Sequence, residues 1–292
     1  MKILEIHSIQ DSLKEVEQVV NKFDYFYLMG IYQTTEFSKK LNSKYNLQGS
    51  LFSIKSYSDF NMSSMNLYYN LSKIVGQEKI IIDFIPNHLG YDNFNFKFGF
   101  GDRRIGNYEW LDTLQLDYTK QETLDYMIRA IKILAPNVGG FRFDMAHLVL
   151  RKNYEQKHNV KLNYEPLEVL VKEAKKVNPN LLFIAETYQD YEELKNLGFI
   201  VYRVEPRRNQ VVTIDCAKEL VVIDNHDEKL LYWECNANLK CFFDKLKELS
   251  FYQNTLWYLP AIMGYIERPS ANYYSCLFHI NNNLKKHYLK WI

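Results

Sequence analysis

The chain has 292 residues, of which 47% are hydrophobic and 15% aromatic, and its 36 Lys and Arg nearly balance its 35 Asp and Glu. This much apolar surface can offset the entropy cost of folding, which excludes a disordered chain, and the length fits two domains or one large barrel. A net charge of +1 lacks the basic excess of proteins that neutralise many phosphates, so we expect no nucleic-acid partner.

The N-terminus and the cysteines favour a cytoplasmic protein without a membrane partner. The first apolar run meets a charged residue within five positions, which is too short for the apolar region of a signal peptide. No segment reaches the roughly 20 apolar residues that a membrane-spanning helix needs. Cys216, Cys235, Cys241 and Cys276 form no CxxC pair, and we expect reduced thiols.

Short apolar runs alternate with amphipathic stretches, the pattern of parallel strands joined by crossover helices. The predicted strands are 3–9, 25–30, 79–86, 139–144, 181–186, 199–203, 220–224 and 256–263. The predicted helices are 12–20, 36–41, 62–75, 119–134, 165–177, 190–196, 237–249 and 282–291, with a weak sixth crossover helix over 204–219. Capping-box spacings place two helix starts at Ser12 with Glu15 and at Thr119 with Glu122.

Eight strand and helix units in one chain predict an α/β fold, a closed (β/α)8 TIM barrel. Residues 89–118 follow the third strand, lack any period and exceed an ordinary connection in length, so we interpret them as a short insertion or reduced second domain. No Pro- or Ser-rich linker divides the chain. We expect a single domain over residues 1–292.

Four of the predicted strands end in polar side chains, at the edge where a barrel builds its active site. They are Asp83, Asn87 and His88, then Arg142, Asp144 and His147, then Glu186, and finally His226 and Asp227. Each alone fits a turn or a helix cap. Together, three carboxylates would meet in one cleft, and two carboxyl groups flanking a glycosidic bond are the machinery of sugar hydrolysis.

Four segments of this chain carry a resemblance to a known family. The signature regions of the α-amylase superfamily, family 13 of the glycoside hydrolases, resemble, in the same order, IIIDFIPNH (80–88), GGFRFDMAH (139–147), LFIAE (182–186) and VVIDNHD (221–227). Two further family segments, the loop after the second strand and the stretch before the fourth, resemble GSLFSIKSY (49–57) and WLDTLQLDY (110–118).

The resemblance implies a retaining glycoside hydrolase or transglycosylase of α-glucosidic linkages, built as a minimal catalytic barrel without the C-terminal β-sandwich of many relatives. It implies Asp144 as nucleophile, Glu186 as general acid/base and Asp227 as a carboxylate that binds sugar hydroxyls. The substrate-binding residues that it implies are Asp83, His88, Arg142, His226, Tyr57 and His147. The expected partner is an oligosaccharide or a small α-glucoside.

Asn87 aligns with an asparagine that binds calcium in many members of the family, and it is the one calcium candidate. The family commonly has Lys and His where this chain has His147 and Leu148, and the insertion is short for a calcium cage. We therefore expect no cofactor.

Two other classes of protein stay open at this point. A barrel that has lost catalysis would bind carbohydrate or a protein partner. A metal-dependent barrel hydrolase would use these histidines and aspartates as ligands, but no HxH or HExxH spacing occurs. A barrel without the β-sandwich would also gain from a homo-oligomeric contact that covers its surface.

Overall fold

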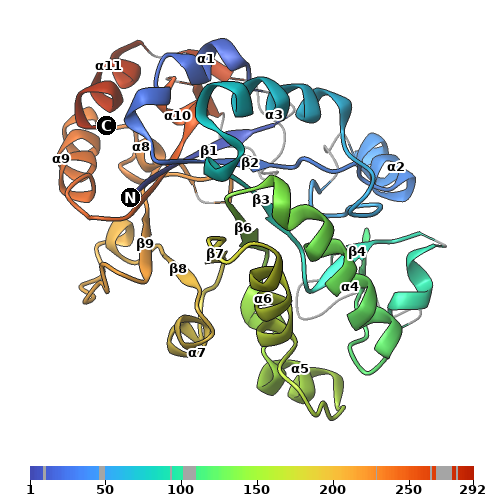
Figure 1. The fold of residues 1–292 in the computed structure, drawn as a ribbon. Coiled ribbons are helices and arrows are strands. Elements are labelled where there is room, and N and C mark those ends of the chain that lie inside the picture. The colour runs from blue at the N-terminus through green and yellow to red at the C-terminus, as the bar shows by residue number, and fades with distance from the viewer. Residues whose placement is uncertain are drawn as a thin grey trace.

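The computed structural model describes residues 1–8, 11–45, 50–92, 94–100, 110–227, 229–263, 265–267, 278–280 and 282–292. Its centre is a closed barrel of parallel strands, arranged in the cyclic order β1, β2, β3, β6, β7, β8, β9, β10 (Figure 1). These strands are β1 Lys2–His7, β2 Tyr25–Met29, β3 Ile80–Phe84, β6 Gly140–Phe143, β7 Leu182–Ala185, β8 Ile200–Arg203, β9 Glu219–Val222 and β10 Thr255–Tyr258. The predicted (β/α)8 barrel is confirmed.

Helices surround the barrel on its outside (Figure 1). The α-helices are α1 Leu13–Glu17, α2 Glu36–Tyr45, α3 Met62–Val75, α4 Gln121–Leu134, α5 Arg151–His158, α6 Pro166–Val177, α7 Tyr191–Asn196, α8 Leu231–Glu234, α9 Leu239–Leu249, α10 Leu259–Ile262 and α11 Asn282–Trp291. The 3₁₀ turns are η1 Val20–Lys22, η2 Gln77–Lys79, η3 Asn95–Phe98, η4 Ala135–Asn137, η5 Ala146–Val149 and η6 Pro206–Arg208. α4 buries the apolar stripe that its sequence predicts, including Leu124, Met127 and Ile131.

Barrel strands are buried on both faces, and β3 shows why its sequence is apolar throughout. All five of its residues are buried, and they pair with β2 on one side and β6 on the other. The start of β6 lies close to the backbone of its neighbours. A Cβ at Gly139 would lie 1.9 Å from the Glu78 carbonyl oxygen, and one at Gly140 would lie 2.4 Å from the Leu182 carbonyl oxygen. Glycine at both positions lets the barrel close there.

The predicted insertion contains a small antiparallel sheet. Strands β4 (His88–Gly90) and β5 (Thr113–Gln115) pair with His88 opposite Gln115. Residues 93 and 101–109 of the insertion lie outside the described residues. Strands of three residues are too short to carry a readable period, so the sequence did not predict this pair. The pair fixes His88 just beyond the end of β3.

Two predicted elements between and after the late strands are wrong. Residues 204–219 contain the turn η6 and the first residue of β9 instead of a helix, and the β-branched run Val211–Ile214 is a poor helix former. The strand predicted over 256–263 ends at Tyr258 and continues as α10. Pro260 lies in the first turn of α10, where its missing N–H is tolerated, whereas a strand ladder would lose a donor.

The two predicted capping boxes have different outcomes. The box of Ser12 and Glu15 is present at the start of α1. The box of Thr119 and Glu122 does not form, because α4 begins at Gln121 and its N-cap is Lys120. The Thr119 backbone N–H and hydroxyl both donate to Asp117 Oδ1 instead. The Thr119 hydroxyl is therefore bonded to Asp117 and does not cap the helix.

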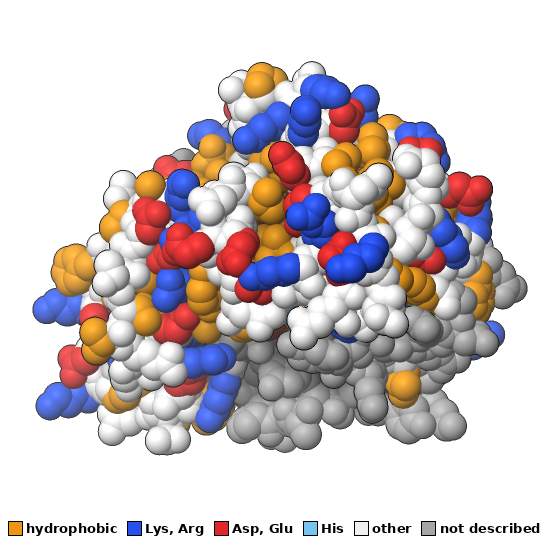
Figure 2. Space-filling view, turned by 90° about the horizontal axis from the view of Figure 1, so that it is seen from below, with side chains coloured by type: hydrophobic (Ala, Val, Ile, Leu, Met, Phe, Trp, Pro, Cys, Tyr) orange, Lys and Arg blue, Asp and Glu red, His pale blue; other side chains and the backbone are white. Residues whose placement is uncertain are grey.

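The surface carries mixed charge. On the described part of the face in Figure 2, basic and acidic side chains lie interspersed and no single-sign patch gathers.

The two termini lie near one another (Figure 1), where the Met1 ammonium donates to the Gln253 carbonyl and Lys2 Nζ donates to the Ile292 carbonyl. None of the described helices is both long enough and apolar enough to cross a membrane.

Candidate active site

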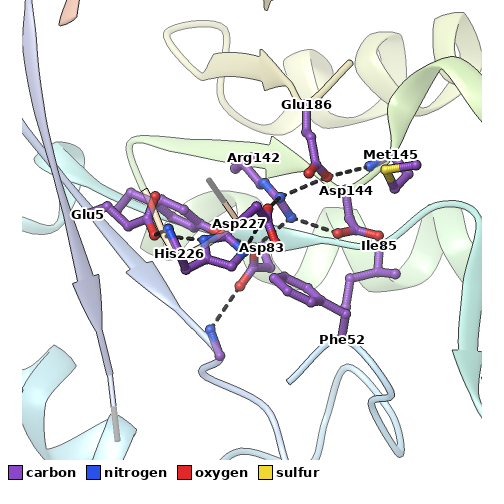
Figure 3. A network of polar contacts seen from close by, with 12 residues as sticks. Glu5, Phe52, Asp83, Ile85, Arg142, Asp144, Met145, Glu186, His226 and Asp227 are labelled. Carbon is purple, nitrogen blue, oxygen red and sulfur yellow. Dashed lines mark hydrogen bonds and ion pairs between the residues drawn. The ribbon is translucent and has the colours of Figure 1, made fainter. Parts of the chain in front are cut away.

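Arg142 lies on β6 and contacts carboxylates from four elements of the fold (Figure 3). Its Nη1 is 2.7 Å from Asp144 Oδ1 and 3.5 Å from Asp83 Oδ1. Its Nη2 is 2.7 Å from Glu186 Oε2 and 3.6 Å from Asp227 Oδ2. The guanidinium side chain is only 1% exposed, so one buried cation organises the whole group.

The backbone turn after Asp144 holds Glu186 in place. Met145 has φ 43°, a left-handed conformation that is uncommon and strained for a residue with a side chain. This conformation directs the Met145 N–H to Glu186 Oε2 at 2.9 Å. The Ala146 N–H donates to the Glu186 carbonyl at 3.0 Å, so the ends of β6 and β7 are tied together. The strain therefore serves to fix one carboxyl beside the other.

Glu186 and Asp227 have pKa values displaced in opposite directions. Burial raises the pKa of Glu186 well above its usual value, and the charges of Asp227 and Asp144 add to this against the opposing effect of Arg142. Burial would also raise the pKa of Asp227, but His226 and Arg142 hold it below its usual value. One carboxyl thus favours the protonated form and its neighbour the ionised form, the arrangement that acid catalysis needs.

His226 lies between two carboxylates. Its Nδ1 is 2.7 Å from Glu5 Oε1 on β1, and its Nε2 is 3.0 Å from Asp227 Oδ2. Burial opposes the charged ring, yet Asp227 and Glu5 raise the pKa of His226 well above its ordinary value. The charged form of the ring is therefore favoured at this end of the barrel.

Asp83 is fully engaged by the protein. Its Oδ1 accepts from the Tyr27 hydroxyl at 2.5 Å and its Oδ2 from the Gly30 N–H at 2.9 Å, so it ties the end of β2 to β3. Burial raises the pKa of Asp83 to about 6, and Arg142 opposes this increase. The side chain faces Arg142 and has no oxygen without a protein donor.

His88 and His147 flank the carboxylates as buried imidazoles. Burial lowers the pKa of His88, and it lowers the pKa of His147 to about 4, so neutral rings are favoured. The charge of Asp144 acts on both rings, which places them near the carboxylate group. The His88 ring centroid lies 5.2 Å from that of Trp110, and His147 Nδ1 is buried without a hydrogen-bond partner among the described residues.

Tyr57 packs among aromatic rings and bonds to the backbone. Its ring is 5% exposed and stacks on Phe84 at 4.8 Å, and its hydroxyl both donates to the Ile85 carbonyl and accepts from the Ile85 N–H. Phe52, from the same segment, reaches the site instead. Its ring lies 4.9 Å from Arg142 Cζ and 5.4 Å from the His226 ring. Gly49 of this segment lies outside the described residues.

Asn87, the calcium candidate, is hydrogen-bonded within the protein. Its Oδ1 accepts from Gln115 Nε2 at 3.0 Å, and its Nδ2 lies 3.2 Å from His88 Nδ1. The amide oxygen that would bind calcium thus accepts a hydrogen bond from within the protein. Across the described ranges, no three His, Cys, Asp or Glu side chains group closely enough to hold a metal ion.

The structure brings six of the sequence-predicted residues into one polar network, namely Asp83, Arg142, Asp144, Glu186, His226 and Asp227. Sequence reasoning missed Glu5, Tyr27, Phe52 and Met145. A signal existed for Glu5, because a charged residue inside the apolar run Lys2–His7 must find a partner when the strand is buried. Nothing local signalled the other three.

The chain resembles solved structures in its fold but matches no known protein family in sequence. No protein-family model and no curated protein matches the chain in sequence. An α-amylase from Lactobacillus plantarum matches in structure with a TM-score of 0.71 at 16% identity, covering 99% of this chain and 79% of that one. A maltogenic α-amylase from Thermotoga neapolitana gives 0.70 at 16% identity, covering 99% and 74%. A debranching enzyme from Nostoc punctiforme gives 0.69 at 12%, covering 99% and 79%.

The chain therefore has the fold of the α-amylase catalytic barrel, as the four sequence segments predicted.

Proposed function

We propose that the protein is a retaining glycosidase or transglycosylase that acts on α-glucosidic linkages of an oligosaccharide or a small α-glucoside. The observation that carries this proposal is the gathering of Asp144, Glu186 and Asp227 around Arg142 at the ends of three barrel strands. A fold neighbour from Arthrobacter globiformis, a cyclic maltosyl-maltose hydrolase, is solved in complex with maltose, which supports the same substrate class here.

In the first step, the Asp144 carboxylate attacks the anomeric carbon as the bond to the leaving oxygen breaks. Glu186 gives its proton to that oxygen, and a covalent glycosyl ester on Asp144 results. The raised pKa of Glu186 supports this role, because the acid must start protonated. Retaining enzymes need their two carboxyl groups about 5–5.5 Å apart, and contact of both with one guanidinium favours such a short separation.

In the second step, the Glu186 carboxylate takes a proton from water, whose oxygen attacks the anomeric carbon and releases Asp144. A sugar hydroxyl in place of water gives transglycosylation with the same groups. Asp227, which is 28% exposed and held ionised, would accept hydrogen bonds from sugar hydroxyls. His226, His88 and His147 would line the same subsite.

Asp83 and Arg142 have a supporting role in this proposal. Because both oxygens of Asp83 accept from the protein, it would position Arg142 and the end of β2 and leave sugar contacts to others. Arg142 would orient Asp144 through the 2.7 Å contact.

The test is product analysis by mass spectrometry and NMR after incubation with maltooligosaccharides, aryl α-glucosides, sucrose and trehalose. We expect turnover with the α-configuration retained at the anomeric carbon, and loss of turnover in the Asp144→Asn variant. Asp244→Asn, which changes an exposed carboxylate on α9, is the matched control and keeps full activity. Sugar that binds without turnover would favour the non-catalytic binding barrel, and inverted product would reject the retaining mechanism.

A further inference from the structure

Glu5 is a fully buried acidic residue at the centre of β1, with 0% exposure. Leu4 and Ile6 beside it are also fully buried and belong to the hydrophobic core. Glu5 Oε1 accepts from the His226 backbone N–H at 3.0 Å and lies 2.7 Å from His226 Nδ1 (Figure 3). A buried carboxylate is costly unless it is paired, so the two contacts with His226 are what stabilises it.

We propose that Glu5 is the positioning residue that keeps His226 doubly protonated, with Nδ1–H donating to Glu5 and Nε2–H beside the Asp227 carboxylate and the sugar that Asp227 binds. This inference rests on the proposed function and deepens it, because it assigns the charge state of a substrate-facing ring to a residue outside the four signature segments.

The argument for double protonation is geometric. A neutral imidazole has a single N–H, so only one of its nitrogens can donate. Both nitrogens of His226 face carboxylate oxygens, with Nδ1 2.7 Å from Glu5 Oε1 and Nε2 3.0 Å from Asp227 Oδ2. A carboxylate oxygen repels the lone pair of an unprotonated ring nitrogen, so a ring that faces carboxylates at both nitrogens favours the imidazolium.

The groups around His226 agree with this charge state. Glu5 on β1 and Asp227 on the same loop attract the positive ring, and burial opposes them. Burial lowers the pKa of His7, also on β1, to about 4, and the charge of His226 adds to this effect. Arg142 lies 3.6 Å from Asp227, and the Phe52 ring lies 5.4 Å from the imidazole centroid. Glu5 and Asp227 are therefore two carboxylates that face the two nitrogens of the ring.

A purely structural role for Glu5 makes a different prediction. If Glu5 only anchored the His226 backbone, a neutral amide of the same shape would serve, because its oxygen also accepts N–H bonds. Glu5→Gln keeps the acceptor and removes the charge. Glu219→Gln is the matched control, since Glu219 is also a buried glutamate on a barrel strand but pairs with Lys195 and Arg203.

The experiment is a ¹⁵N NMR titration of the histidine side chains without substrate, with the His226 signals assigned by their loss in His226→Gln. We expect both ring nitrogens of His226 to stay protonated to about pH 8 in the native protein, and to lose a proton at least about one pH unit lower in Glu5→Gln. In kinetics, kcat/KM of Glu5→Gln should fall roughly 10- to 100-fold at about pH 8, with its basic limb moved to lower pH. Glu219→Gln leaves both readouts unchanged.

An unshifted His226 titration in Glu5→Gln overturns the inference, and so does a native His226 that is neutral at about pH 7. If Glu5→Gln fails to fold, the titration is made in Asp227→Asn, where Glu5 is the carboxylate left at the ring: two protonated nitrogens at about pH 8 support the inference and one rejects it. If the native protein hydrolyses no α-glucoside, the proposed function fails while the titration still decides whether Glu5 holds the charge.

Discussion

At the scale of single residues, the charge balance of the site depends on Arg142. A buried arginine stays protonated, and here it is the shared partner of Asp83, Asp144, Glu186 and Asp227. Removing one partner of a buried ion pair leaves uncompensated charge in a medium of low dielectric constant, which costs more than the pair itself contributes. The same residue that orients the proposed nucleophile is therefore also a determinant of stability.

We expect Arg142→Met to lower the free energy of unfolding by about 3–5 kcal/mol at neutral pH, because the buried carboxylates lose their counter-charge. The cost shrinks toward about pH 5, since the loss of Arg142 raises the pKa of Asp83 above its native value of about 6 and the carboxyl takes up a proton. Urea unfolding of the native protein and the variant between about pH 5 and 7 measures this difference in the free energy of unfolding. Lys152→Met, which removes a cation that is 51% exposed, should cost under about 1 kcal/mol. Equal costs for the two variants would contradict the argument.

Glu186→Gln tests the acid role separately from the nucleophile. We expect a loss of about 10²–10⁴-fold in kcat/KM on maltooligosaccharides, because the leaving sugar oxygen needs a proton. In an aryl α-glucoside, an acidic phenol leaves as the phenolate and needs no proton. The rate of the first step on these substrates should therefore change little. The native activity should fall as pH rises through the raised pKa of Glu186, and the variant should lose this basic limb. A uniform loss on both substrate types would reject the assignment.

At the scale of elements, the barrel strands could be predicted because each is a buried apolar run, and Asp144, Glu186 and Asp227 were found because they follow such runs. Two predictions failed because a local feature outweighed the hydrophobic period. The β-branched run Val211–Ile214 disfavours a helix over 204–219, and Pro260 ends the strand β10 early. The partner of Glu5 could not be read from the sequence, because His226 lies 221 positions away and only barrel closure brings the two together.

The start of α3 offers a prediction about an element. Asn61 Oδ1 accepts from the Ser63 and Ser64 N–H groups at 2.9 and 3.3 Å, which satisfies two of the free donors of the first turn. We expect Asn61→Ala to cost about 1 kcal/mol in the free energy of unfolding. Asn61→Asp keeps the acceptor at the helix N-terminus and should be close to neutral. Chemical denaturation of both variants measures this, and an equal loss in both would show that capping is not the cause.

At the scale of the whole molecule, a buried polar cluster ties the closing helix to the barrel. The Tyr288 hydroxyl on α11 donates to Asp224 Oδ2 just beyond β9, and Asp224 Oδ1 accepts from the Leu231 N–H at 2.7 Å at the start of α8. Arg207 lies 3.6 Å from the same carboxylate. Burial raises the pKa of Asp224 from 3.8 to about 6, with Arg207 and Tyr288 opposing. This link joins α11 to the segment between β9 and α8, across a sequence separation of 64 residues.

The folded state thus binds a proton on Asp224 more tightly than the unfolded state does, so this carboxyl reduces stability as pH rises through about 6. Tyr288→Phe removes a donor to the ionised carboxylate and raises that pKa further. We expect the variant to lose about 1 kcal/mol near pH 5, where Asp224 is neutral, and about 1.5–3 kcal/mol near pH 8, where it is charged. Hydrogen exchange in α11 should quicken in the same pH range, because the helix loses its anchor.

Tyr118→Phe is the matched control for this pH dependence. The Tyr118 hydroxyl is buried and donates to the Pro86 carbonyl at 2.7 Å, an acceptor that does not titrate. Its removal should therefore cost a similar amount at both pH values, about 1 kcal/mol. Both substitutions keep the aromatic ring and its packing, so the difference between them isolates the charge on Asp224. Parallel pH profiles for the two variants would mean that Asp224 does not titrate as its burial requires, and that α11 is held by packing alone.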